Sequence, residues 1–273
     1  VNDLATLIDN KAFISEKTIT FANDSHQEIL ETTQTAVEDK DGTVIGVLGI
    51  GHDITKLKQV SDRLLLKERY KDVLINISIK LINLPTNEIT QAIYDALEVM
   101  AEFTLSDRAY IFRYDFENDF ACNTHEWCKE GISPEIDNSQ NINLEDISDL
   151  VESHRKDEYF DVEDVANLPD GNFKEILQQQ KIQSLLVMPL SLNGKLVGFV
   201  GFDRCRTKEK YTLEDRELLK LFTELLVNVK QRQIAEKKLQ LAENVFEHAR
   251  EGIMIVDKDV KIREINEAFS RIT

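Results

Sequence analysis

The sequence is poor in cysteine and has no long apolar run. Its three cysteines are Cys122, Cys128 and Cys205, and an odd, sparse set favours a reducing compartment over a secreted, disulfide-stabilised fold. No segment approaches the roughly 18 consecutive apolar residues that cross a bilayer. The opening residues VNDLATLIDNKAF lack the basic start and apolar core of a signal peptide. We therefore expect a cytoplasmic protein with no membrane contact in this segment.

Basic residues are in the minority, with 33 Lys and Arg against 50 Asp and Glu and a formal net charge of -17. A surface of this sign repels the phosphates of nucleic acids and of anionic lipids. We therefore do not expect nucleic acid as a partner. The apolar share of 42% is ordinary for a globular protein, so a packed core is expected.

Signatures of common enzymes are also missing. The sequence has no Gly-rich phosphate loop, GxSxG elbow, HExxH pair or kinase signature. His26, His52, His154 and His248 are scattered, and none stands in a context resembling a phosphoacceptor box. We expect no catalysis in this segment, and no pattern identifies a cofactor.

The first part of the chain predicts a small sheet followed by a long helix. Three β-branched runs, at 15–22, 27–38 and 43–54, predict an antiparallel meander with a tight turn at Asp41-Gly42. This meander has no opposing layer of its own, so more of its domain is expected upstream. From position 55 the chain is charged and free of Gly and Pro, which predicts a helix with a narrow apolar stripe that pairs with a second copy. The stripe includes Leu57, Val60 and Leu64.

The central part predicts an antiparallel sheet covered on both faces. Consecutive bulky residues at Tyr110-Ile111-Phe112 indicate that neither face is exposed to solvent, and Asn193-Gly194 is a strong hairpin turn. The expected elements are a helix at 86–104, strands at 108–115 and 120–130, short helices at 144–154 and 173–180 within a polar excursion over 131–182, and strands at 182–192 and 195–205.

A last long helix is expected over 212–249, starting at a capping box formed by Thr212 and Asp215. Two short strands are expected over 252–269. The helix carries apolar seams that we expect to pair with a second copy, namely Leu218, Phe222, Leu225 and Val229, followed by Ala235, Leu239, Ala242 and Phe246.

These parts resemble known signalling modules. Residues 41–55, ending in Asp53-Ile54-Thr55, are similar to the closing strands of a PAS domain, and residues 241–269 to the opening of another. Residues 73–232 resemble a GAF domain, with NTHEWCKEGISPEIDNSQNI at 123–142 most like GAF domains placed beside PAS modules in cyclic-di-GMP enzymes and sensor histidine kinases. The resemblance implies a PAS part at 1–55, a helical linker at 56–72, a GAF domain at 73–232, a second linker at 233–249 and a PAS start at 250–273.

The resemblance implies a sensory module that passes a signal to an output domain in the same chain. We expect a parallel homodimer, because both chains must enter and leave each domain pair in the same direction. The expected output is cyclic-di-GMP synthesis or hydrolysis, with a histidine kinase as the alternative. A ligand-free dimerisation spacer and a thiol redox sensor remain open.

A small-molecule pocket is expected between the sheet and the excursion. Bilin-binding GAF domains attach the chromophore to a Cys-His pair in the excursion, which is absent here, and the cyclic-nucleotide pattern is absent as well. The same aromatic residues could simply form core. The candidate ligand-binding residues are Tyr110, Phe112, His125, Trp127 and Arg204, with Phe160 and Phe173 as lid residues.

The spacing Cys122-x-x-His125-x-x-Cys128 raises the question of a zinc site. On a regular strand the two cysteines point to one face and the histidine to the other, so the three cannot converge on one ion. We therefore expect no metal. Thiol chemistry at these cysteines is weakly supported, because no electropositive setting accompanies them.

Overall fold

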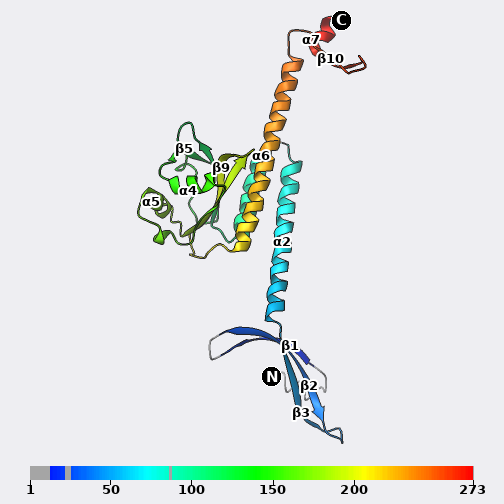
Figure 1. The fold of residues 1–273 in the computed structure, drawn as a ribbon, viewed down its shortest axis with the longest axis vertical. Helices are drawn as coiled ribbons and strands as arrows, with labels where there is room; N and C mark the ends of the chain where they lie inside the picture. The colour runs from blue at the N-terminus through cyan, green and yellow to red at the C-terminus, as the bar shows by residue number, and fades with distance from the viewer. Residues whose placement is uncertain (1–12, 22–25, 86–87, 273) are drawn as a thin grey trace. The chain divides into compact units, whose positions relative to one another are not determined.

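The computed structural model describes residues 13–21, 26–85 and 88–272 (Figure 1), and the chain divides into two compact units, residues 1–72 and 73–273. Within the described residues, no helix combines the length and apolar character that crossing a bilayer requires.

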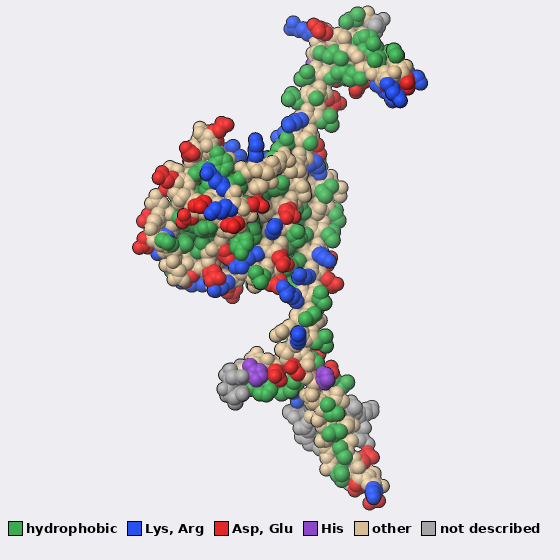
Figure 2. All heavy atoms as spheres, in the orientation of Figure 1, with side chains coloured by type: hydrophobic (Ala, Val, Ile, Leu, Met, Phe, Trp, Pro, Cys, Tyr) green, Lys and Arg blue, Asp and Glu red, His purple; other side chains and the backbone are tan. Residues whose placement is uncertain are grey.

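The first unit contains the predicted antiparallel meander, in the order β1-β2-β3. Its turn is closed by the carboxylate of Asp39, which accepts hydrogen bonds from the backbone N–H groups of Asp41 and Thr43. Isoleucines at 14, 45 and 50 are 59–65% exposed on this sheet, and hydrophobic side chains are visible on it in Figure 2. The described part of the unit thus has no layer that covers them. The strands are β1 (Phe13–Thr20), β2 (Gln27–Glu38) and β3 (Val44–Asp53).

Helix α2 (Thr55–Asn83) starts directly after β3. Asp53 accepts hydrogen bonds from both the backbone N–H and the hydroxyl of Thr55, and these bonds lower the pKa of the Asp53 carboxyl. The Thr55 hydroxyl accepts in turn from the backbone N–H of Ile29 at 2.7 Å. The Asp-Ile-Thr segment therefore fixes the start of the helix to the neighbouring strand.

The second unit is built on a six-stranded antiparallel sheet, in the order β6-β5-β4-β9-β8-β7. The tight Asn193-Gly194 turn joins β8 and β9, with positive φ at both residues, as a two-residue hairpin requires. The expected α+β fold, an antiparallel sheet with helices on both faces, is confirmed. The strands are β4 (Arg108–Asp115), β5 (Phe120–Cys128), β6 (Ile142–Asn143), β7 (Phe160–Val162), β8 (Ser184–Leu192) and β9 (Lys195–Arg204).

Two helices cover one face of this sheet, α3 (Ile89–Phe103) against β4 and β5, and α6 (Leu213–Glu247) against β8. Phe222 of α6 is fully buried and meets Phe202 of β9 edge to face. The excursion covers the other face. It contains α4 (Ser148–Arg155), the 3-10 turn η1 (Val165–Asn167) and α5 (Asn172–Gln179).

Helix α6 begins with the predicted capping box, in which Thr212 accepts from the N–H of Asp215 and Asp215 accepts from the N–H of Thr212. Further along, Arg232 donates to the backbone oxygens of Ile82 and Leu84 at the end of α2. Within the second unit, α6 and the last turn of α2 are therefore tied together.

The structure corrects one part of the predicted dimer seam. Leu218, Phe222 and Val229 are buried, since they lie on the sheet-facing side of α6. The sheet of their own domain provides the apolar partner that we expected from a second copy. Leu225 is half-buried, whereas Leu239 is 71% exposed.

The second unit ends in a short motif. It consists of β10 (Met254–Val256), β11 (Ile262–Ile265) and α7 (Glu267–Ile272). Asn266, fully buried, accepts through its side chain from the N–H of Ile253 and donates to the oxygens of Phe246 and Glu251. One amide side chain thus joins the end of α6 to this hairpin.

Candidate ligand cavity

A cavity of about 50 Å³ lies between the six-stranded sheet and the excursion. Its walls are mostly apolar. The sheet contributes Tyr110, Phe112 and Phe199, and the excursion contributes Leu150 and Leu177. Phe112 and Phe199 stack with their ring centroids 4.7 Å apart, so the floor is a rigid aromatic surface.

One end of the cavity is polar and centred on Arg108, a fully buried side chain. Its guanidinium nitrogens lie 3.5 Å from Glu126 Oε1 and 3.6 Å from Asp203 Oδ2. It also donates to Gln180 Oε1 and to the backbone oxygen of Ser133, each at 3.1 Å. Arg108 therefore joins the sheet to two separate segments of the excursion.

The two carboxylates beside Arg108 have further partners. Glu126 Oε2 accepts from the backbone N–H groups of Glu135 and Ile136 at 2.8 Å, and Asp203 Oδ1 accepts from the Tyr110 hydroxyl at 2.9 Å. Burial raises the pKa of Asp203 to about 7, although Arg108 and Tyr110 oppose this rise. Burial also raises the pKa of Glu126. Both carboxylates are thus held at an electrostatic cost that Arg108 only partly offsets.

A β-bulge in β5 determines which residues face the cavity. Ile111 pairs with His125 but Phe112 pairs with Asn123, so Thr124 is the extra residue. The bulge turns Asn123 and Glu126 to the same face, where both line the cavity. Without it, residues three apart on a strand would lie on opposite faces.

The model of the GAF domain family matches residues 88–229, more than half of the chain. The chain belongs to the GAF domain family. A PAS domain model matches residues 240–273, which confirms the expected PAS start after the GAF domain. The PAS assignment of residues 1–55 and the five domain boundaries stay predictions.

Individual relatives agree with this assignment. The methanogenesis regulatory histidine kinase FilI of Methanothrix harundinacea is 32% identical over 174 residues, which is 62% of this chain but 19% of that kinase. The phycocyanobilin-bound GAF domain of a cyanobacterial phytochrome has a TM-score of 0.52 at 16% identity, covering 61% of this chain and 96% of that chain. A GAF domain from a Coxiella burnetii phosphoenolpyruvate-protein phosphotransferase has a TM-score of 0.51 at 15% identity, covering 62% and 96%. The solved structures support the fold.

The GAF domain places the seven predicted ligand residues in different surroundings. Tyr110, Phe112 and Phe173 line the cavity, and Phe160 packs edge to face on Phe173 at 5.7 Å. His125 and Trp127 lie outside the lining.

The bulge explains where these two residues point. The His125 ring faces Tyr94 of α3 on the opposite side of the sheet, with the two ring centroids 5.2 Å apart. Strand alternation places Trp127 on that side too. Burial lowers the pKa of His125, and Lys230 of α6 lowers it further. His125 therefore belongs to the helix-covered side of the GAF domain.

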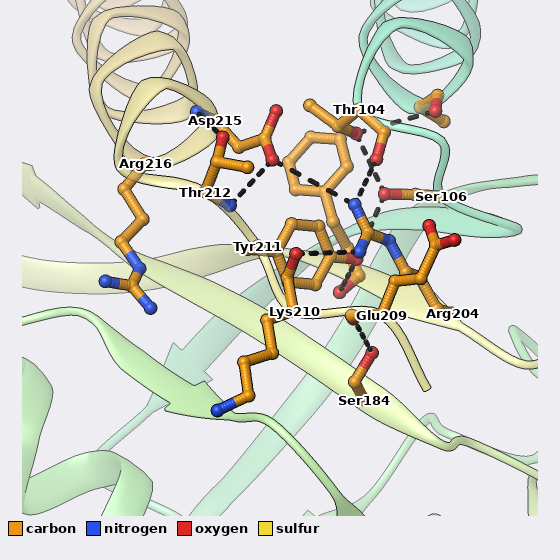
Figure 3. Close-up of polar contacts among 12 residues, drawn as sticks. Thr104, Ser106, Ser184, Arg204, Glu209, Lys210, Tyr211, Thr212, Asp215 and Arg216 are labelled. Atoms are coloured by element: carbon orange, nitrogen blue, oxygen red, sulfur yellow. Dashed lines mark hydrogen bonds and ion pairs between the residues drawn. The ribbon is translucent and has the colours of Figure 1, made fainter. Parts of the chain in front are cut away.

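Arg204 does not line the cavity, where we had expected it, but lies beside the start of α6 (Figure 3). Its guanidinium donates to the backbone oxygens of Thr104 at 2.8 Å and Lys210 at 3.0 Å. Its Cζ lies 4.2 Å from the centroid of the Tyr211 ring, and its Nη2 lies 4.0 Å from Asp215 Oδ2. Arg204 thus connects the end of α3 to the loop that starts α6.

The polar residues of the cavity were missed by sequence analysis, which looked for aromatic side chains. Arg108, Asn123 and Glu126 line the cavity, and Asp203 is paired with Arg108. A charged residue in an otherwise apolar strand could have indicated this polar cluster. Arg108 stands directly before Ala-Tyr-Ile-Phe, and Asp203 directly after Gly-Phe. Such residues are seldom fully buried unless they are paired.

The three cysteines are free thiols. Cys122 pairs with Arg113 and Cys128 with Arg108, so the bulge turns these cysteines to opposite faces, and the expectation that they share one was wrong. Burial raises the pKa of Cys128 to about 11 and that of Cys205 to about 12. Within the described ranges, no cluster of three His, Cys, Asp or Glu side chains has a metal-binding arrangement.

Proposed function

We propose that this GAF domain senses a small ligand in the cavity between its sheet and the excursion, and that the signal passes to an output domain in the same chain. The observation that carries the proposal is the apolar cavity with a buried polar end at Arg108. Mostly apolar pockets with a few directed polar groups are typical ligand sites. Tyr110, Phe112 and Phe173 are the predicted ligand contacts that the proposal keeps.

Two consecutive residues of β9 offer a route from the cavity to the exit helix. Asp203 faces Arg108 and Tyr110, whereas Arg204 holds the carbonyls of Thr104 and Lys210 beside the start of α6. A ligand that moves Arg108 would shift Asp203 and, through the backbone, the anchor of α6.

We propose that the relay works in a parallel homodimer. Leu57, Val60 and Leu64 of α2 are at least 50% exposed. In the second unit, further apolar side chains are exposed on α2 at Ile75, Ile79 and Ile82 and on α6 at Leu221. Exposed stripes at helical spacing are suited to pairing between copies. This seam replaces the buried residues that we had expected to pair.

The match to FilI favours a histidine kinase as the output, because FilI is itself a histidine kinase. Cyclic-di-GMP turnover remains the second candidate, from the resemblance noted in the sequence. A bilin is disfavoured, because a cavity of about 50 Å³ is far smaller than a tetrapyrrole. The raised thiol pKa values of Cys128 and Cys205 weigh against a thiol redox sensor.

The test combines ligand screening with crosslinking. A thermal-shift screen would use amines, alcohols, amides and carboxylates of up to six non-hydrogen atoms. In a background with all three native cysteines replaced by serine, Leu239→Cys and Ala242→Cys variants would then be oxidised with and without each hit. We expect a hit to change the ratio of crosslinking rates at the two positions. A monomeric protein at high concentration, or equal rates in both conditions, contradicts the relay. Absence of any hit favours the ligand-free spacer.

A further inference from the structure

The polar end of the cavity presents two buried acceptors that receive no hydrogen bond from the described residues, Asn123 Oδ1 and Glu126 Oε1. The nearest described charge to Glu126 Oε1 is Arg108 Nε at 3.5 Å, an ion pair without a hydrogen bond. Both residues line the cavity. Buried polar atoms are seldom left without a partner in native proteins, so a donor from a ligand or water is expected at this position.

The backbone places these two residues on the same face of the sheet. The bulge at Thr124 turns Asn123 and Glu126 to the cavity side although they are three residues apart. The second oxygen of Glu126 is held by two backbone N–H groups, which fixes the direction of Oε1. The acceptors are therefore preorganised.

The charge balance of the cluster is uneven. Arg108 supplies one positive charge against the two carboxylates of Glu126 and Asp203, all with side chains that are 0–2% exposed. The terminal nitrogens of Arg108 donate to Gln180 and Ser133. When both carboxyls are ionised, the three side chains carry one net negative charge, and burial raises the pKa of both carboxyls, that of Asp203 to about 7. A cationic donor would stabilise their ionised forms.

We propose that the cavity binds a small protonated alkylamine, with its N–H groups donating to Asn123 and Glu126 and its alkyl part among the apolar walls. This identification rests on the proposed sensory function. At about 10–15 Å³ per water-sized group, 50 Å³ accommodates about four non-hydrogen atoms. Ligands of this size bind no more tightly than a Kd of about 10–100 µM, and commonly at about 1 mM.

The test uses three probes of four non-hydrogen atoms each: n-propylammonium, 1-propanol and acetate. Binding to the whole chain would be measured by methyl NMR titration at constant ionic strength, following the leucine methyl groups of the cavity wall. We expect propylammonium to bind at least tenfold more tightly than the other two, and to perturb Leu150 and Leu177.

Variants separate the charge from the cavity. Glu126→Gln keeps the shape of the side chain and removes its charge, so propylammonium affinity should fall at least tenfold while that of 1-propanol changes little. Glu152→Gln removes the same charge from an exposed side chain on α4 and should leave both affinities unchanged. If Glu126→Gln fails to fold, Asn123→Leu tests the other acceptor. Leu150→Phe, which fills the apolar end, should weaken all binding.

The outcomes distinguish this inference from the sensory proposal. Preferential binding of acetate or 1-propanol in the cavity refutes the amine while leaving ligand sensing intact. Equal loss in Glu126→Gln and Glu152→Gln shows a non-specific charge effect and also refutes it. If no probe binds and the wider screen has no hit, the cavity holds water and both proposals fail.

Discussion

His154 gives a pH dependence whose size follows from its surroundings. The side chain is 1% exposed, its Nδ1 lies 2.8 Å from the Tyr114 hydroxyl, and the Phe199 ring packs beside it. Burial lowers the pKa of His154 from 6.5 to about 4, and the backbone of Val187 offsets part of this fall. Between pH 4 and 6.5 the unfolded chain therefore binds more protons than the folded one, and stability is lost as the pH falls. At 1.36 kcal/mol per pH unit, the loss amounts to about 3 kcal/mol.

The measurement compares urea unfolding of the native protein and of His154→Gln from pH 7.5 to pH 4. Trp127, the only tryptophan, reports on the GAF domain through its fluorescence. Other titrating groups, including Asp203, contribute to both proteins and cancel in the difference. We expect the stability advantage of the native protein to shrink by about 3 kcal/mol across this range. Tyr114→Phe keeps the imidazole and should retain the pH dependence while losing about 1 kcal/mol for the hydrogen bond. A difference that is independent of pH would refute the reasoning.

Two further substitutions test close contacts within the GAF domain, Gly201→Ala beside the cavity wall and Arg204→Met at the anchor of α6. Gly201→Ala would place a Cβ about 2.2 Å from the Tyr110 ring, so we expect a loss of about 2–4 kcal/mol in urea unfolding. Gly171→Ala, where no atom lies within 4 Å, is its control and should be nearly neutral. Arg204→Met should cost about 2–3 kcal/mol, because it leaves the Thr104 carbonyl without its buried donor. If Gly201→Ala or Arg204→Met left the free energy of unfolding in urea unchanged, the contact that it disrupts would not be energetically important.

Local signals in the sequence predicted much of the fold. The Asn193-Gly194 hairpin and the Thr212 capping box depend on a few adjacent residues, and both lie where they were expected. The sheet covered on both faces followed from bulky neighbours at Tyr110 and Phe112. These features are set by backbone preferences and by hydrophobic pattern, which a single sequence contains.

The site was less predictable because it depends on register and on distant pairs. The bulge at Thr124 reverses side-chain direction beyond it, and alternation alone cannot reveal an extra residue. That one residue moved Glu126 to the cavity and His125 away from it. Arg108 and Asp203 are adjacent only because β4 pairs with β9. Likewise, an apolar stripe such as that of α6 indicates that something covers it but not what.

A weak ligand places a quantitative demand on the relay. If propylammonium binds one state with a Kd of about 1 mM, then 10 mM ligand favours that state by at most about 1.4 kcal/mol, or roughly tenfold. The two packings of the helices must therefore lie within about that energy of each other. Both should be populated without ligand, so Leu239→Cys and Ala242→Cys should each crosslink to a measurable extent in the free protein. Crosslinking at only one of them before ligand is added would require a ligand that binds more tightly than a Kd of about 1 mM.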